Sequence, residues 1–385
     1  MKYKRILAIL LVTFCLLSCV ACGGTKAEDS SAVSSSMTSS ITSTELKPVS
    51  SDESTSEGNF SSIDTISSNS SNESTVSTGS TDITSSNSSS NSSSNSSSNS
   101  SSNVDTKPID RIQKIGTVGG NGVLYKFNDN IIKLEVPFHN IYTTVFFVKI
   151  NNSGDYLIID TASNESDVQS YILPAAKALS VNLHKVVGIL LTHTHGDHAG
   201  GLNSLSKQCP NATVYGVKSS NSDASHGYKQ ISDGTMIGEY IKVVTIKGHD
   251  SDACGYLDTR TKTLMSGDSL QLYGIASWGC LVSDLGSYVA SMNKLASMDI
   301  ENILTSHAYV PNGAYDLGKT EVKKYIQDCI DCIDITKTFV ESLYKSGVTN
   351  TAEIEKQYIE VMKETYFDFP SGGFGSLINQ LIRGL

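Results

Sequence analysis

The sequence from residue 108 onward predicts an α/β fold in which sheets are covered by helices. Two observations carry this prediction. Short runs rich in β-branched and aromatic residues recur between turn residues, and helical periodicities separate groups of these runs. Groups of strands with intervening helices pack as layers around a common core. The segment 108–385 is long enough to bury one sizeable core.

The first half of this segment contains five predicted strands and one helix. The strands are expected at 123–127, 131–136, 144–150, 156–160 and 185–191. Asn, Asp and Gly separate the first four, and these residues favour turns. Before the fifth strand, apolar residues recur at the three- and four-residue spacing that is typical of a helix: Val168, Tyr171, Ile172, Ala175, Ala176 and Leu179. The run 185–191 is almost continuously apolar, as in a strand buried on both faces.

The second half continues the same alternation of strands and helices. Strands are expected at 213–217, 241–247, 254–258, 263–265 and 302–305, and helices at 286–298, 319–343 and 351–364. We therefore predict one folded domain at 108–318, with a helical extension at 319–385 that packs on the same domain.

The first 22 residues have the pattern of an export signal. A positively charged start at 2–5 precedes an apolar run at 6–17, which is too short to span a bilayer as a helix. Cys22, preceded by Val-Ala and followed by Gly-Gly, resembles the lipidated cysteine of bacterial lipoproteins, and Cys19 is the competing position. The resemblance implies an anchor at the outer face of the bacterial cell membrane. An ordinary cleaved signal and a secreted protein form the alternative.

Residues 23–107 predict a disordered tether. From 27 to 107 the single aromatic residue is Phe60, and Ser, Thr, Asn, Asp and Glu dominate. Such a composition buries too little apolar surface to offset the entropy of ordering the chain. A random coil of this length spans roughly 50 Å on average. The tether would therefore hold a domain clear of the cell surface.

The charge balance argues against a nucleic-acid partner. The chain carries a formal net charge of -10 at pH 7, and no basic block follows the first few residues. Binding to a phosphate backbone relies on clusters of Lys and Arg. We therefore expect no nucleic acid, and no membrane contact beyond the N-terminal anchor.

Residue types that bind metal ions gather directly after the predicted strand 185–191. Residues 193–198 read His-Thr-His-Gly-Asp-His, so three imidazoles and a carboxylate fall within six positions. Side chains two apart at a strand end point the same way, which lets His193 and His195 bind one cation together. Asp197 and His198 leave the turn in another direction and can serve a second cation nearby.

This motif resembles the signature of the metallo-β-lactamase superfamily, and further pieces of that pattern occur in order. They are Asp160-Thr161 before the motif and, after it, Gly248-His249, Ser266-Gly267-Asp268 and Ser306-His307. The resemblance covers about 120–310. It implies a four-layer αββα sandwich with metal ions at one edge.

The resemblance also implies a ligand set and a cofactor. His193, His195 and His249 would bind one metal ion, Asp197, His198 and His307 a second, and Asp268 would bridge the two. Two zinc ions are expected, because His195 stands where the iron-binding redox members have glutamate. A shared water would become hydroxide at neutral pH, and Asp197 would orient it and pass a proton to the leaving group.

Aspartate at position 268 resembles the glyoxalase II-like thioesterases and lactonases, whereas the best-known β-lactam-cleaving members carry cysteine or serine there. We expect an exported hydrolase that uses a zinc-activated hydroxide to cleave a carbonyl-type bond in a small molecule: a lactone, ester, thioester or β-lactam. A zinc phosphodiesterase and a non-catalytic, metal-stabilised surface protein are the alternatives. The chain departs from the family at Asp250-Ser251-Asp252, where Thr-Pro-Gly is usual, and these carboxylates would change the shape and charge of the pocket.

Several points stay open at the level of sequence. Cys254, Cys280, Cys329 and Cys332 allow disulfides without requiring them. The oligomeric state is likewise undetermined. Tyr309, next to the last histidine of the pattern, is a candidate for substrate contact.

Overall fold

The computed structural model describes residues 112–218 and 227–385. The predicted signal peptide at 1–22, the tether at 23–107 and both candidate lipidation sites, Cys19 and Cys22, lie outside the described residues. None of the helices within the described ranges combines the length and the apolar character needed to cross a membrane. All five cysteines in these ranges are buried and unpaired.

Within the described residues, fourteen strands form two sheets. The first sheet runs in chain order from β1 to β8: β1 Gln113–Val118, β2 Gly122–Lys126, β3 Ile131–Phe138, β4 Ile141–Lys149, β5 Tyr156–Ile159, β6 Val186–Leu190, β7 Thr213–Gly216 and β8 Tyr228–Gln230. The second runs β14-β13-β12-β11-β10-β9: β9 Met236–Ile237, β10 Ile241–Thr245, β11 Cys254–Asp258, β12 Thr263–Met265, β13 Asn302–Tyr309 and β14 Gly313–Leu317.

Strand direction changes within each sheet. The strands β1 to β5 pair antiparallel through hairpins, whereas β5, β6, β7 and β8 run parallel. In the second sheet only the β12–β13 pair is parallel. Parallel neighbours need a crossover, and their carboxyl ends meet at one edge of the sheet. The strand directions therefore allow the loops that follow β5, β6 and β12 to approach one another beside β13.

The helices connect and cover these strands. They are α2 Glu165–Asp167, α3 Leu173–Ala178, α4 Gly196–Ala199, α5 Leu202–Gln208, α6 Leu285–Ala296, α7 Lys319–Lys345, α8 Thr351–Lys363 and α9 Gly375–Arg383. The helix expected from Val168 to Leu179 is divided by a π-helical turn, Val168–Ile172, just before Pro174. Proline has no N–H to donate to the preceding turn, which favours such a widened turn there.

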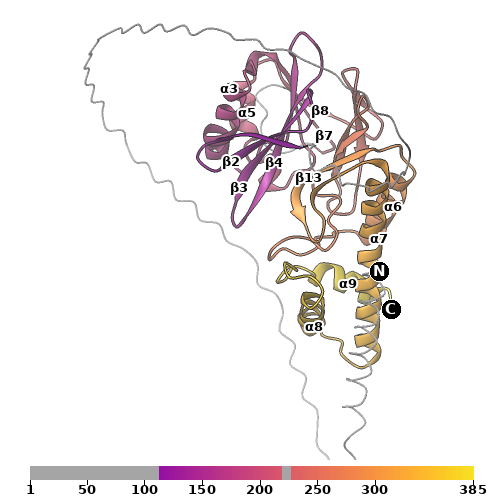
Figure 1. The fold of residues 1–385 in the computed structure, drawn as a ribbon. Helices are drawn as coiled ribbons and strands as arrows, with labels where there is room; N and C mark the ends of the chain where they lie inside the picture. Colours follow the sequence, from indigo (N-terminus) through magenta and orange to yellow (C-terminus); the bar gives the residue numbers. More distant parts are fainter. Residues whose placement is uncertain (1–111, 219–226) are drawn as a thin grey trace, which may run out of the picture. The chain divides into compact units, whose positions relative to one another are not determined.

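Three apolar clusters separate four layers. Along β4, Phe146 and Val148 point into the cluster between the sheets, while Val145 and Phe147 point into a cluster shared with α3 and α5. This split follows from the two-residue period of a strand. Figure 1 shows α3 and α5 on the outer side of the first sheet and α6 and α7 beyond the second.

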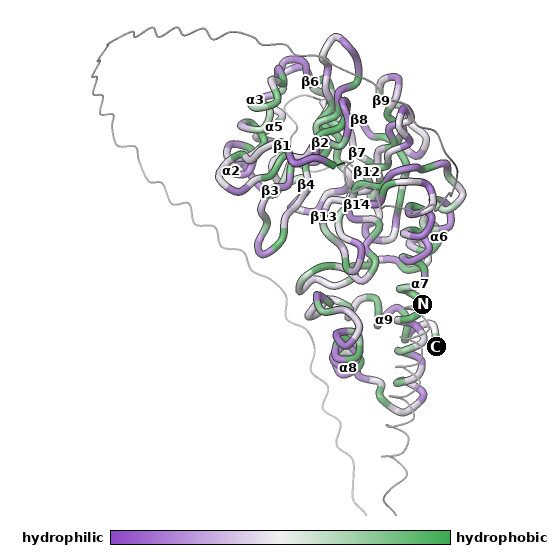
Figure 2. Tube along the Cα trace, in the orientation of Figure 1, coloured by the Kyte–Doolittle hydropathy of each residue, from purple (hydrophilic) through white to green (hydrophobic). Residues whose placement is uncertain are grey.

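The third cluster joins the second sheet to the C-terminal helices. Leu264 on β12 and Ile303 on β13 pack with Tyr325 of α7 and Tyr358 of α8. Hydrophobic and hydrophilic residues alternate along α7 and α8, so each helix presents one apolar side to this cluster (Figure 2). The predicted α/β sandwich with helices outside both sheets is therefore confirmed.

Some elements lack a strong sequence signal. Strand β1 lies at a sheet edge with mostly exposed residues, so its alternation of apolar and polar residues is weak. Helix α9 is short, but Leu377, Ile378 and Leu381 are buried at helical spacing and give a signal that could have predicted it. The segment before α9 contributes Phe369 and Phe374 to the third cluster, while Phe367 is 97% exposed.

Truncation of the inter-sheet cluster should destabilise the protein strongly. We expect Phe146→Ala to lower the free energy of unfolding by about 3–5 kcal/mol, because Phe146 is fully buried between the sheets. Phe367→Ala is the matched control and should change it by less than about 0.5 kcal/mol. Denaturant titration of both variants measures the difference, and equal effects would contradict this placement of the core.

Candidate metal centre

The seven predicted ligands converge from both sheets. His193 follows β6, His195 precedes the short helix α4, and Asp197 and His198 lie within α4. From the second sheet come His249, after β10, Asp268, after β12, and His307, within β13. The structure divides them into two clusters, one of His193, His195 and His249 and one of Asp197, His198, Asp268 and His307, each with its ligand atoms within 4.8 Å of one another.

The first cluster consists of three imidazole nitrogens. Nε2 of His249 lies 3.3 Å from Nε2 of His193 and 3.0 Å from Nδ1 of His195. Lone pairs at such distances repel unless a cation or a proton lies between them. Nitrogen ligands of a tetrahedral zinc ion, with zinc–nitrogen bonds of 2.0–2.1 Å, are about 3.3 Å apart. The spacing therefore fits a zinc-sized cation.

The second cluster combines two imidazoles with two carboxylates. Nε2 of His307 lies 3.2 Å from Oδ2 of Asp197 and 3.3 Å from Oδ2 of Asp268. Nε2 of His198 lies 3.3 Å from Oδ2 of Asp197 and 3.4 Å from Oδ1 of Asp268. Asp268 also reaches the first cluster, because its Oδ2 is 3.8 Å from Nε2 of His249. One carboxylate thus touches both groups of ligands.

Two buried polar atoms in the second cluster, Nε2 of His198 and Oδ1 of Asp268, make no hydrogen bond among the described residues, although they lie 3.4 Å from each other. Leaving such an atom unsatisfied costs about 1–3 kcal/mol. Nitrogen and carboxylate oxygen are ligands that divalent zinc accepts. A divalent cation would satisfy both atoms, so the residues present fit a bound metal ion.

Hydrogen bonds at the remote ring nitrogen fix the orientation of four histidines. Nδ1 of His198 faces Oδ2 of Asp160 at 2.9 Å, and Nδ1 of His193 faces the hydroxyl of Thr192 at 3.1 Å. Nδ1 of His307 faces the main-chain oxygen of Tyr142 at 2.5 Å, and Nδ1 of His249 faces that of Leu281 at 2.8 Å and the side-chain amide nitrogen of Gln271 at 2.5 Å. An acceptor at Nδ1 favours the proton there, which leaves Nε2 its lone pair for the cluster.

Asp160 supports the metal loop as well as His198. Its carboxylate accepts the amide of Thr192 at 2.8 Å and the hydroxyl of the same residue. Thr161 donates its hydroxyl to the carbonyl of His198 at 2.9 Å. Asp160 is fully buried and has a positive φ of 61°. A strained backbone conformation is therefore held where the first sheet meets the ligand loop.

The electrostatics differ between the clusters. Burial lowers the pKa of His193 and of His249, so the first cluster favours neutral imidazoles. In the second cluster burial opposes protonation of His307, but Asp268 and Asp197 raise its pKa to about 9. Burial likewise opposes ionisation of Asp268, yet His307 and His198 hold its pKa well below the usual range. The second cluster is thus a set of mutually compensating charges.

Some supporting groups could not be recognised in the sequence. The carbonyls of Tyr142 and Leu281 are main-chain groups, which any residue type supplies. Tyr309 is buried, with its ring edge-on to His307 at 6.0 Å, and its hydroxyl has no hydrogen-bond partner among the described residues. Tyr309 therefore stands beside the ligand set, as its position after His307 predicts.

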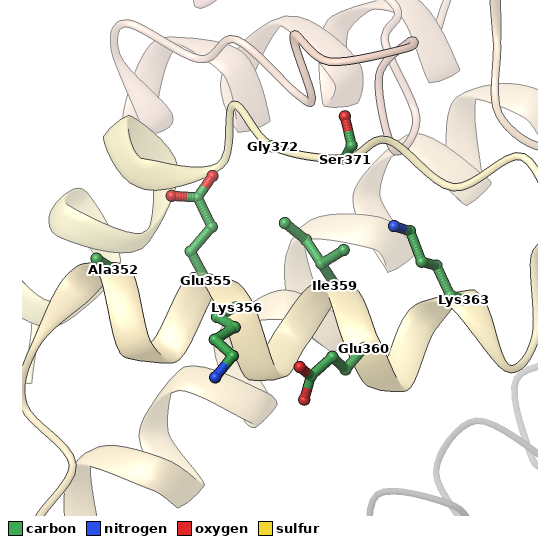
Figure 3. A pocket seen from close by; sticks show the side chains of 8 residues that line it. All are labelled: Ala352, Glu355, Lys356, Ile359, Glu360, Lys363, Ser371 and Gly372. Atoms are coloured by element: carbon green, nitrogen blue, oxygen red, sulfur yellow. The ribbon is translucent and has the colours of Figure 1, made fainter.

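A separate surface hollow of about 430 Å³ lies along α8. Its lining comprises Ala352, Glu355, Lys356, Ile359, Glu360, Lys363, Ser371 and Gly372, and shares no residue with the two clusters. Figure 3 shows Glu355, Ile359 and Lys363 pointing from the helix toward the Ser371–Gly372 loop. Glu355 already accepts the amide of Phe374 at 2.7 Å. The hollow offers no convergent set of ligands.

Without metal, the stability of the protein should fall between pH 6.5 and 9. The raised pKa of His307 means that its ion pairs contribute fully below the ordinary value of 6.5 and are lost as the pH rises through about 9. Denaturation midpoints of the chelator-treated chain across this range test the expectation. His307→Gln should flatten the profile and the exposed control His184→Gln should not; an unchanged profile in His307→Gln would contradict the assigned ion pairs.

Comparisons with known proteins agree with this geometry. Residues 141–307 match the family model described as the metallo-beta-lactamase superfamily. The chain is 33% identical over 125 residues to "Lactamase-like protein vrtG" of Penicillium aethiopicum, which covers 32% of this chain and 38% of that protein. It is 28% identical over 142 residues to "Atrochrysone carboxyl ACP thioesterase" of Claviceps purpurea, covering 36% and 43%.

Among solved structures, a metallo-beta-lactamase family protein of Thermus thermophilus has a TM-score of 0.48 at 13% identity, and the match covers 67% of this chain and 93% of that one. The matches to the two relatives from Penicillium and Claviceps span 38% and 43% of those proteins, less than half of each. The family match includes β4 through His307 and so encloses all seven predicted ligands. Residues 141–307 are therefore similar to the metallo-β-lactamase superfamily over the part of the chain that contains both ligand clusters.

Proposed function

We propose that this protein is a dinuclear zinc hydrolase that cleaves a carbonyl-type bond: a lactone, ester, thioester or β-lactam. The observation that carries the proposal is the pair of adjoining ligand clusters, in which Asp268 of the second lies 3.8 Å from His249 of the first. A structural zinc site is usually closed by four ligands. Seven ligands in two adjoining groups favour a catalytic centre instead.

The donor types support zinc. The first cluster offers three imidazole nitrogens, and the second offers two imidazoles with two carboxylates. Imidazole suits zinc, whereas all-oxygen sets suit magnesium or calcium. His193, His195 and His249 would hold one ion, and Asp197, His198 and His307 the other, with Asp268 between them.

The reaction assigns distinct tasks to the residues. When bound, the two cations supply a water of lowered pKa and polarise the oxygen of the scissile bond. Asp197 lies at the second cluster, buried, with its carboxylate 3.2 Å from Nε2 of His307 and 3.3 Å from that of His198. The two histidines hold it in the anionic form, although burial and Asp268 oppose this. Asp197 is therefore placed to accept the proton of the attacking water and pass it to the leaving group.

Two relatives support the carbonyl class. One is named a lactamase-like protein and one an acyl-carrier-protein thioesterase, and both names point to attack on a carbonyl carbon. The export pattern at 1–22 supports an action outside the cytoplasm, as a lipoprotein anchored through Cys22 or Cys19 at the outer face of the bacterial membrane, or as a secreted protein. A small molecule in that compartment would be the substrate.

Acid release from a substrate panel tests the function. The zinc-loaded full chain should hydrolyse one class among lactones, esters, thioesters and β-lactams in a pH-stat, and a chelator should abolish that activity. Restored turnover after zinc is returned distinguishes loss of metal from unfolding. Silence on the panel with cleavage of a nitrophenyl phosphodiester would replace the proposal by a phosphodiesterase, and silence on both would leave a binding protein.

Loss of a ligand should remove metal and turnover together. We expect His195→Ala and Asp268→Ala to lower the zinc content and to reduce kcat at least about a hundredfold, since a catalytic metal contributes several kcal/mol to the transition state. His184→Ala, at an exposed position, is the matched control and should retain both. Full zinc occupancy with unchanged kcat in the two ligand variants would refute the assignment.

A further inference from the structure

We propose that Asp250 is a positioning residue for His195, holding its ring so that Nδ1 faces the first metal ion. The inference rests on the proposed function, because it concerns how one metal ligand is oriented. It arises where the chain departs from the family pattern, at Asp250-Ser251-Asp252.

His195 uses the opposite ring nitrogen from the other four histidines of the centre. Nδ1 of His195 lies 3.0 Å from Nε2 of His249 and so faces the first cluster. Its Nε2 points away and lies 3.3 Å from Oδ2 of Asp250. A neutral imidazole that binds a cation through Nδ1 must carry its proton on Nε2, and a carboxylate acceptor stabilises that tautomer. Asp250 thus lies at the outer nitrogen of His195 at ion-pair distance, as Asp160 lies at the outer nitrogen of His198, where a hydrogen bond of 2.9 Å forms.

Packing alone does not fix the ring of His195. Its side chain is 41% exposed, whereas the other four histidine residues are at most 3% exposed. A half-exposed ring can rotate and exchange tautomers unless a directed contact restrains it. Within the described residues, the contact recorded at its Nε2 is the one to Asp250. His195, the least buried of the five histidines, therefore depends most on a carboxylate contact for the orientation of its ring.

Asp250 is itself held in place by its other oxygen. Oδ1 accepts the amide and the hydroxyl of Ser251, the latter at 2.9 Å, and lies 3.6 Å from Nζ of Lys218. This leaves Oδ2 directed at His195. A carboxylate oxygen of Asp250 is thus presented to Nε2 of His195 as an acceptor.

A second carboxylate ties the loop to the ligand strand. Asp252 accepts the hydroxyl of Thr194 at 2.8 Å, directly before His195 in the chain. The carbonyl of Asp250 accepts the amide of Gly248 at 3.3 Å, which closes the turn after β10. The loop that carries Asp250 is thus fastened both to the metal loop and to itself. A proline in place of Ser251 would remove the amide that holds Oδ1.

The tautomer of His195 is the first readout, measured on the metal-free full chain. Histidine labelled with 15N at mildly alkaline pH reports which ring nitrogen carries the proton, with His195→Asn identifying the signal. We expect Nε2–H for His195 in the wild type and a mixture of tautomers in Asp250→Ala. Lys218→Met is the control, because it removes the other charge at Asp250 and leaves Oδ2 in place. An unchanged tautomer in Asp250→Ala would overturn the proposal.

Zinc affinity is the second readout, by competition with a chromophoric chelator. Outer carboxylates of metal-bound histidines change metal affinity by 10–100-fold, and a partly exposed pair belongs at the lower end. We therefore expect about tenfold weaker zinc binding in Asp250→Ala and a smaller loss in Asp250→Asn, whose carbonyl oxygen still accepts. Equal losses in the two variants would show a bulk charge effect and overturn the positioning role. A wild type that binds no zinc, with the tautomer as expected, would reject the proposed function instead.

Discussion

The structure depends on holding the ligand groups of the metal centre close together before a metal ion binds. In each cluster the ligand atoms approach within 4.8 Å, and in the first cluster the lone pairs of three imidazole nitrogens converge. Burial of such groups is unfavourable until a cation joins them. The remaining contacts of the centre therefore have to fix each side chain in advance, so that binding energy is not used to order the ligands.

Much of this restraint crosses from one sheet to the other. His307 on β13 donates to the carbonyl of Tyr142 on β4, and the hydroxyl of Thr144 on β4 donates to the carbonyl of Ser306. A further bond, from the hydroxyl of Thr143 on β4 to the carbonyl of Asp197 in α4, fastens the metal loop to its own sheet. The apolar cluster between the sheets sets the separation over which these bonds form. The packing of the core therefore determines the geometry of the ligands. A cation that binds only the folded state adds its binding free energy to the stability of the protein.

The sequence predicts the fold class correctly, and it nominates the ligand candidates, because both depend on patterns local in the chain. Periodicities place most strands, and spacing identifies His193 and His195 as a pair. The supporting contacts depend on tertiary structure. The carbonyls of Tyr142 and Leu281 have no side-chain signature, and the opposite tautomer of His195 follows only from where Asp250 lies. The edge strand β1 was not predicted, because an exposed edge strand needs little alternation of apolar and polar residues.

The charge of the centre explains why its two halves differ. The first cluster contributes only imidazoles, with the pKa of His193 and of His249 lowered by burial, whereas Asp197 and Asp268 bring two negative charges to the second. In the proposed dinuclear form, the two cations carry four positive charges and the two carboxylates carry two negative charges. The surplus of positive charge favours an anionic nucleophile and the oxyanion that develops as a carbonyl is attacked. Asp250 lies at the ring nitrogen of His195 that faces away from the cluster, and so orients that ring from outside the ligand set.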